Sequence, residues 1–165
     1  MPEPSERRSP DVHDALLATA QRLLGTSGDP PTETDLRRAI STAYYALFHG
    51  LSRLVVDLAF SQLDPSEPDW VKAYRGLVHK ETKRRCNVIN LRAQTFPEPV
   101  PRIGADFCKL HEARERADYV PDAEFTSESA TMLVEAARDA LRRLAELDSA
   151  TRHRFAAYLE QQPRK

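Results

Sequence analysis

The sequence predicts an all-α protein, an antiparallel up-and-down bundle of about five helices. Ala and Leu dominate, no stretch of six residues alternates apolar with polar side chains, and prolines divide the chain into helix-length segments. The length of 165 residues, with 41% hydrophobic and 30% charged, fits one globular domain. We expect that domain over residues 9–160, between an N-terminal tail (1–8) and a C-terminal tail (161–165).

The first expected helix spans residues 9–24. Ser9 suits its N-cap, Pro10 its first turn, and two aspartates the positive end of its dipole. The second, residues 32–60, opens with Thr32 and Asp35 at the spacing of a capping box. Apolar residues then recur at spacings of three and four, which predicts a stripe facing a helical core: Leu36, Ile40, Ala43, Leu47, Leu51, Leu54 and Leu58.

A polar and aromatic line lies on the other side of this second helix. It contains Arg38, Thr42, Tyr45 and His49, with Phe48 near its edge. Such a line indicates either a helix buried on both sides within an oligomer or an internal network that satisfies the tyrosine and histidine tips. We favour the internal network.

The remaining helices follow the prolines. A third helix is expected over residues 68–85, with Trp70, Tyr74, Leu77 and Val78 inside, and residues 86–101 should be irregular. A fourth, residues 103–119, must stop before Pro121 because the residue that precedes a proline is pushed out of the helical region. Thr126 or Ser127 should cap a fifth helix that reaches Leu147, and a break at Asp148–Ser149 precedes a last short helix.

Composition excludes several classes of protein. With 24 basic and 25 acidic residues the net charge is −1, which excludes a wholly basic nucleic-acid binder but not a local basic patch. No apolar run is long enough for a membrane span, and the charged N-terminus lacks the apolar stretch of a secretory signal, so we expect a cytoplasmic protein that does not enter a membrane. Cys86 and Cys108 fit ordinary half-buried residues.

No metal or cofactor is expected. No two of the five histidines are three or four residues apart, and HExxH, Gly-rich and Gly-x-Ser-x-Gly motifs are missing from the sequence. The nearest approach to a ligand cluster is His111, Glu112 and Glu115.

Basic residues concentrate in the expected third helix and beyond it. From Lys72 to Arg92, seven Lys or Arg residues stand against one acid, Glu81. On a continuous helix one face would carry Lys72, Arg75, His79 and Lys83. This face indicates either a strip that binds nucleic-acid phosphates or an acidic partner, or simply a solvated helix surface.

The end of the fourth helix offers a second candidate site. Arg114 and Asp118 are one turn apart, so an intrahelical ion pair is the simplest interpretation. The alternative is that Arg114 and Tyr119 converge at the helix end, where a guanidinium can bind a phosphate through two hydrogen bonds.

Two segments together resemble a known family. The run AISTAYYALFH, residues 39–49, followed about sixty residues later by Arg114-x-Arg116-Ala-Asp-Tyr119, is similar to the HEPN domain (higher eukaryotes and prokaryotes nucleotide-binding). The resemblance covers residues 35–147 and implies a helical bundle that forms a homodimer. Many members are metal-independent ribonucleases of toxin–antitoxin or defence systems, and others are non-catalytic modules that pair with a nucleotidyltransferase.

The resemblance also implies roles for particular residues. Arg114 matches the motif arginine, but the chain has Arg-x4-Tyr in place of Arg-x4-6-His, with Tyr119 at the histidine position. A tyrosine with a pKa of about 10 is a poor base at neutral pH. We therefore expect an RNA- or nucleotide-binding protein in which Arg114 and Arg116 stabilise phosphate charge and Tyr119 positions the substrate or protonates the leaving group. The alternative is a non-catalytic module that binds a nucleotidyltransferase or another partner.

Overall fold

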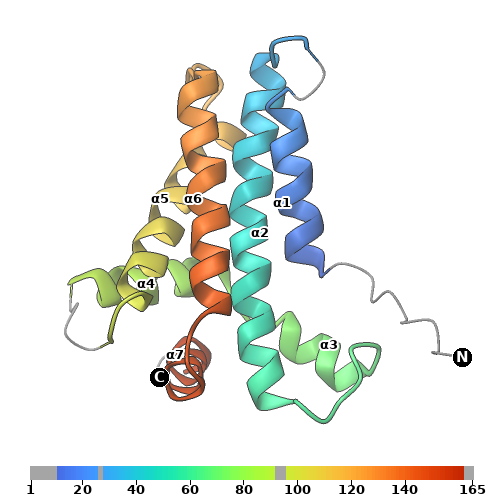
Figure 1. The fold of residues 1–165 in the computed structure, drawn as a ribbon, viewed down its shortest axis with the longest axis vertical. Helices are drawn as coiled ribbons and strands as arrows, with labels where there is room; N and C mark the ends of the chain where they lie inside the picture. Colours follow the sequence, from blue (N-terminus) through green and yellow to red (C-terminus); the bar gives the residue numbers. More distant parts are fainter. Residues whose placement is uncertain (1–10, 26–27, 92–95, 162–165) are drawn as a thin grey trace, which may run out of the picture.

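The computed structural model describes residues 11–25, 28–91 and 96–161. These residues form seven helices and no strand, which confirms the all-α prediction and gives one helix more than the six expected in sequence order. The helices are α1 (Val12–Leu23), α2 (Glu33–Ala59), α3 (Pro68–Tyr74), α4 (His79–Leu91), α5 (Val100–Tyr119), α6 (Ser127–Ala145) and α7 (Ser149–Glu160) (Figure 1). Within the described ranges, no helix is both long and apolar enough to cross a membrane.

Helix α2 is the centre of the bundle. It packs against α1, α5, α6 and α7, and α1, α2 and α6 run side by side along the long axis (Figure 1). The predicted stripe is buried from Leu36 to Leu54, with Leu58 half-buried at its end. Gly50 lets α6 approach closely, because a Cβ there would overlap the Leu141 side chain.

Most of the predicted helix ends are confirmed. The Thr32 side chain accepts a hydrogen bond from the Asp35 N–H at 3.2 Å, and the Asp35 carboxylate accepts one from the Thr32 N–H at 2.9 Å, which completes the capping box. Thr126 caps α6, and α5 ends at Tyr119 as Pro121 requires. The break before α7 is also present, with the Asp148 carboxylate accepting the Thr151 N–H at 2.9 Å.

The start of the chain differs from the expectation. Asp11 occupies the N-cap position of α1, although its side chain makes no capping hydrogen bond, and the expected cap Ser9 lies outside the described residues together with Pro10. The predicted N-terminal tail and all but the first residue of the C-terminal tail also lie outside them. Helix α5 begins at Val100, three residues before the expected start at Ile103.

The prediction of one helix over residues 68–85 is wrong. Helix α3 ends at Tyr74, the chain turns at Arg75–Gly76, and α4 starts at His79. Glycine is a poor helix former, and the Gly76 N–H bonds the Ala73 carbonyl at 2.9 Å, which tightens and ends the turn. The two pieces also pack on different helices, α3 on α2 and α4 mainly on α5. Val78, expected inside, is 61% exposed in the connection.

The expected irregular segment after residue 85 is also partly helical. Helix α4 continues through Cys86 and Ile89, whose side chains are 0% and 1% exposed. Gly104 of α5 lies against the Cys86 backbone, where a Cβ would be 3.2 Å from the Cys86 carbonyl oxygen. Burial against α5 therefore stabilises a helix where the prolines that follow in the sequence predict an irregular segment.

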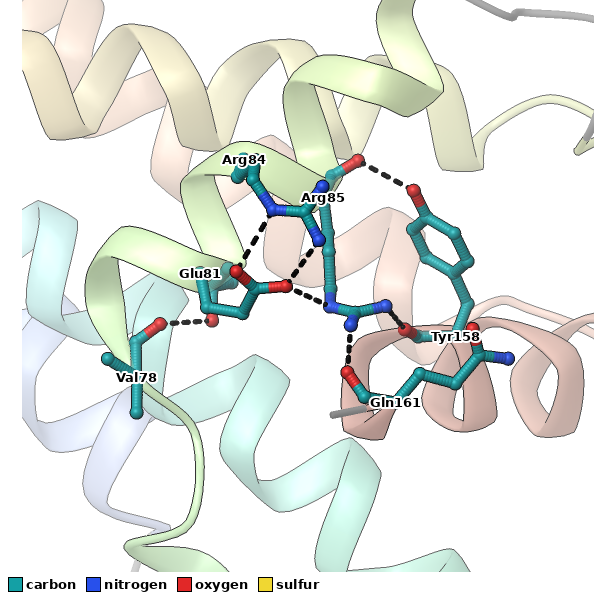
Figure 2. Close-up of polar contacts among 7 residues, drawn as sticks. Val78, Glu81, Arg84, Arg85, Tyr158 and Gln161 are labelled. Atoms are coloured by element: carbon teal, nitrogen blue, oxygen red, sulfur yellow. Dashed lines mark hydrogen bonds and ion pairs between the residues drawn. The ribbon is translucent and has the colours of Figure 1, made fainter. Parts of the chain in front are cut away.

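Arg85 connects α4 to the end of α7. Its side chain is 5% exposed, and its guanidinium donates to the Tyr158 carbonyl at 2.6 Å and to the Gln161 carbonyl. Nε lies 2.8 Å from the Glu81 carboxylate, and the Tyr158 hydroxyl donates to the Arg85 carbonyl at 3.3 Å (Figure 2). Arg84 pairs with the same Glu81 from the solvent side, with 58% of its side chain exposed.

Candidate functional site at the C-terminal end of helix α5

Arg114 lies at the centre of a group of tyrosines. Its guanidinium carbon is 5.7 Å from the Tyr44 ring centroid, 5.5 Å from that of Tyr45 and 5.2 Å from that of Tyr119. Nη2 donates hydrogen bonds to the Tyr45 hydroxyl at 2.9 Å and to the Tyr119 hydroxyl at 3.3 Å. Arg114 is mostly buried, with 15% of its side chain exposed, whereas Tyr119 is 68% exposed. The cluster therefore meets solvent through Tyr119.

Arg114 also forms the ion pair that its spacing predicts. Nε lies 2.8 Å from Oδ2 of Asp118, although no partner meets hydrogen-bond geometry at Nε. Asp118 in turn accepts a hydrogen bond from the Ser41 hydroxyl at 3.2 Å. The predicted ion pair and the predicted convergence of Arg114 with Tyr119 are both present, because the ion pair engages Nε while the tyrosine hydroxyls engage Nη2.

Arg37 of α2 holds the end of α5 in place, a role that the sequence analysis missed. Its Nη1 donates to the carbonyls of Ala117 and Val120, each at 3.0 Å, and its Nη2 to those of Pro121 and Ala123. One side chain thus satisfies four carbonyls at the point where α5 ends. This anchoring fixes the backbone on either side of Tyr119.

Two histidines approach the same cluster through Tyr44. The Tyr44 hydroxyl and Nδ1 of His79 are 2.6 Å apart, and the His111 ring meets the Tyr44 ring edge-on with centroids 5.5 Å apart. Burial lowers the pKa of both histidines, and the positive charge of Arg114 adds to the effect. The same burial raises the pKa of Tyr44 well above its ordinary value of 10.0. Both imidazoles therefore favour the neutral form more strongly than a free histidine does.

The predicted basic strip is not a single face. Lys72 belongs to α3 and Arg75 to the turn that follows, while His79 and Lys83 belong to α4. His79 stacks on Phe48, with ring centroids 3.9 Å apart, instead of pointing to solvent with the others. Lys83 reaches across to α5, where its ammonium is 3.6 Å from Glu112 and 3.9 Å from Glu115.

A different basic face occurs on α4 alone. Lys80, Lys83 and Arg84 recur at helical spacing around a surface hollow that Val78, Glu81 and Asn87 also line. Glu81 in this hollow pairs with Arg84, so the charge of the face is partly offset. This face contains Lys83 of the predicted strip and none of the other three residues.

Arg116 lies on the exposed side of α5, next to Tyr119. Its guanidinium is 5.6 Å from the centroid of the Phe125 ring. Together with Glu112, Glu115, Tyr119 and Val120 it lines an open hollow on the surface. The structure thus brings Arg114, Arg116 and Tyr119 to one end of α5, with Arg114 inside the cluster and Arg116 outside it.

Two members of the polar line on α2, Tyr45 and His49, take part in internal networks. Tyr45 accepts from Arg114, and Nδ1 of His49 is 2.7 Å from the Tyr74 hydroxyl, whose ring stacks on Trp70 with centroids 4.9 Å apart. Thr42 is half-buried and Arg38 is exposed. Tyr45 and His49 thus belong to internal networks.

Potential metal ligands are scarce in the part of the chain that the structure describes. One group of three, Asp11, His13 and Asp14, places its ligand atoms within 4.8 Å of one another, but the Arg53 guanidinium lies 3.0 Å from Asp11 and balances its charge. Around His111, the Lys83 ammonium contacts the two glutamates that could have served as ligands. Cys86 and Cys108 are free thiols, and burial raises the pKa of each.

Comparison with known proteins adds no assignment, because no family model, curated protein or solved structure matches the chain.

Proposed function

We propose that the chain is a HEPN-like RNA-binding protein whose site at the end of α5 binds RNA phosphates and cleaves the strand without a metal. One observation carries the proposal. Nη2 of Arg114 donates hydrogen bonds to the hydroxyls of both Tyr45 and Tyr119, and Tyr119 is exposed. A positioned guanidinium with an exposed phenol beside it suits recognition of a phosphodiester and stacking of a base.

The residues divide the chemistry as follows. The 2′-hydroxyl loses its proton to solvent water and attacks phosphorus, the bond between phosphorus and the 5′-oxygen breaks as the 2′,3′-cyclic phosphate forms, and the leaving 5′-oxygen takes up a proton from Tyr119 or from water. Arg114 stabilises the charge that develops on the phosphorane, with Arg116 adding positive charge from the outer side. Tyr119 is 68% exposed and positions the substrate or protonates the leaving oxygen. The basic face of α4 extends the path of the RNA backbone.

Exposed apolar groups beside the site support a homodimer, and the proposal places this homodimer in the cytoplasm. Tyr119, Val120 and Met132 are 68%, 39% and 57% exposed, although large apolar side chains are usually covered. Pairing across this surface would bring two Arg114 sites together. A toxin–antitoxin or defence role is the biological setting that the resemblance implies.

A second function, a non-catalytic module that docks on a nucleotidyltransferase or another partner, has one observation in its favour. Arg114 is already paired with Asp118 and largely buried, which suits a structural group within an interface. On this proposal Tyr119 and Val120 contact the partner instead of RNA.

The test is cleavage of single-stranded RNA and tRNA in excess EDTA. Wild type should leave cyclic-phosphate ends, and Arg114→Lys and Tyr119→Phe should each reduce the rate. Arg138→Ala is the matched control, because Arg138 is 53% exposed on α6 and pairs only with Glu135 among the described residues. No cleavage and no RNA binding by wild type would reject the proposal and favour the partner-binding module.

A further inference from the structure

We propose that a hollow between α5 and α6, next to the Arg114 site, is a base subsite that binds a guanine of the RNA strand. The inference rests on the proposed RNA-binding function and adds a base preference to it, but it does not depend on cleavage. The hollow has a volume of about 450 Å³. The lining residues that matter here are Glu112, Arg116, Glu124, Phe125 and Met132.

This hollow continues into the surface beside Tyr119. Glu112 and Arg116 of α5 line it, and the same two residues line the open hollow that Tyr119 and Val120 complete. Tyr119 accepts a hydrogen bond from Arg114. A strand whose phosphate lies at Tyr119 therefore has a place for a neighbouring base on the same face of the protein.

The walls of the hollow suit a flat ring. Met132 is 57% exposed, although large apolar side chains are usually covered. The guanidinium carbons of Arg37 and Arg116 each lie 5.6 Å from the Phe125 ring centroid, which holds this aromatic ring in place. Aromatic rings and planar guanidinium groups are the surfaces on which unpaired RNA bases stack. A base in the hollow would also cover Met132.

Two carboxylates line the hollow, and they differ in their partners. Glu112 lies 3.6 Å from the Lys83 ammonium. The Glu124 carboxylate has no hydrogen bond or ion pair to any other described residue. An ionised carboxylate only accepts hydrogen bonds, through two oxygens that lie side by side. Glu124 is therefore complementary to a base that presents two adjacent N–H donors.

Guanine is the one standard RNA base with such an edge. Its N1–H and its 2-amino group are neighbouring donors, which the two oxygens of one carboxylate can accept together. Adenine and cytosine each place a single amino group beside a ring nitrogen that is an acceptor and repels a carboxylate. Uracil places its one N–H between two carbonyls. Because single-stranded RNA exposes these edges, Glu124 should select guanine.

The test measures binding of short 2′-deoxy oligothymidylates, which the site cannot cleave. One position carries guanine, adenine, cytosine or hypoxanthine, and affinity is measured by fluorescence anisotropy at fixed salt. Wild type should bind the guanine oligonucleotide about fivefold to tenfold more tightly than the adenine or cytosine one. Hypoxanthine, which lacks the 2-amino group, should fall between them. This comparison needs no variant to fold.

Two matched variants identify the group responsible. Glu124→Gln should remove the guanine preference, because one acceptor oxygen becomes an NH₂ group that faces the donors of the base. Glu128→Gln is the control, because it removes one negative charge at an exposed residue of α6 that lines neither hollow. It should keep the preference.

The outcomes separate the subsite from the function on which it rests. Binding that depends on Arg114 but is equal for all bases, or that favours another base, would overturn the subsite and leave the proposed function standing. A guanine preference that survives Glu124→Gln, or that Glu128→Gln also removes, would do the same. Absence of binding by every oligonucleotide would reject the proposed function and the subsite together.

Discussion

Two adjacent arginines on α4 share one carboxylate, and they should differ sharply in their contribution to stability. Arg85 is 5% exposed and contacts Glu81 and two carbonyls at the end of α7, whereas Arg84 is 58% exposed and contacts Glu81 alone among the described residues. Removing one partner of a buried ion pair costs about 3–5 kcal/mol, because the remaining polar groups lose their compensation. Replacing Arg85 leaves Glu81 paired with Arg84 but removes the hydrogen-bond donor of two carbonyls at the end of α7. We therefore expect Arg85→Ala to lower the free energy of unfolding by about 3–4 kcal/mol.

This loss is large enough to measure in two ways. For a chain of this size about 1 kcal/mol shifts the melting temperature by about 2–4 °C, so Arg85→Ala should melt about 6–16 °C below wild type. Urea denaturation followed by circular dichroism gives the free energy of unfolding directly. Arg84→Ala should stay close to wild type, because exposed ion pairs contribute little.

The comparison of the two variants tests the reasoning. Equal losses for Arg84→Ala and Arg85→Ala would mean that the shared Glu81 contact, and not the α7 carbonyls, provides the stability. A loss below about 1 kcal/mol for Arg85→Ala would mean that water replaces the guanidinium freely, which contradicts the burial of this side chain.

Three further changes test other parts of the fold. Arg37→Ala should lower the free energy of unfolding by about 2–4 kcal/mol, because four carbonyls at the end of α5 lose their hydrogen-bond donor. The control is Arg38→Ala at an exposed neighbour, which should change this free energy by less than about 0.5 kcal/mol. Urea denaturation of both variants gives the two values. Gly50→Ala should destabilise by about 1–3 kcal/mol, since its methyl would overlap Leu141, and a thermal melt at wild-type stability would contradict the close α2–α6 approach. Hydrogen bonds from Thr151 hold the pKa of Asp148 below its ordinary 3.8, so its stabilisation is present above that pH and is lost as the pH falls through the lower folded pKa. Melting Asp148→Asn and wild type at pH 7 and pH 3 should show a smaller difference at pH 3, and a constant difference would exclude the linkage.

Local signals predicted the bundle well where a single helix carries its own pattern. The stripe from Leu36 to Leu54 and the caps at Thr32, Thr126 and Asp148 depend on residues within one turn or one face, which the sequence displays directly. The break after Tyr74 was not predicted, because α3 and α4 separate in order to pack on different helices. A lone Gly76 is a weak stop signal without that tertiary context.

The candidate site was predictable only along α5. Spacing placed Arg114, Asp118 and Tyr119 together, but spacing within one helix says nothing of Tyr45, His79 or Arg37, which arrive from α2 and α4. Only a helix that continued through the Arg75–Gly76 turn would place His79 on a surface strip with Lys72 and Arg75. The error in the site therefore followed from the error in the fold.

Asp118 offers a way to separate a binding site from a structural ion pair at Arg114. Its carboxylate lies 2.8 Å from the guanidinium, so a bound phosphate must compete with it for the same positive charge. Asp118→Asn keeps an oxygen to accept from Ser41 but removes the competing charge. If Arg114 binds phosphate, the variant should bind a 2′-deoxy oligonucleotide, which lacks the attacking hydroxyl and is not cleaved, about threefold to tenfold more tightly. This corresponds to a binding free energy more favourable by about 1 kcal/mol.

A structural ion pair predicts the opposite result from the same change. Loss of the charge would then loosen the end of α5, lower the melting temperature and leave oligonucleotide affinity unchanged or weaker. Asp139→Asn is a suitable control, because it removes one negative charge at a residue of α6 that pairs with Arg142 and lines no part of the site. Tighter binding by Asp118→Asn but not by Asp139→Asn would identify the Arg114 guanidinium itself as the group for which RNA and protein compete.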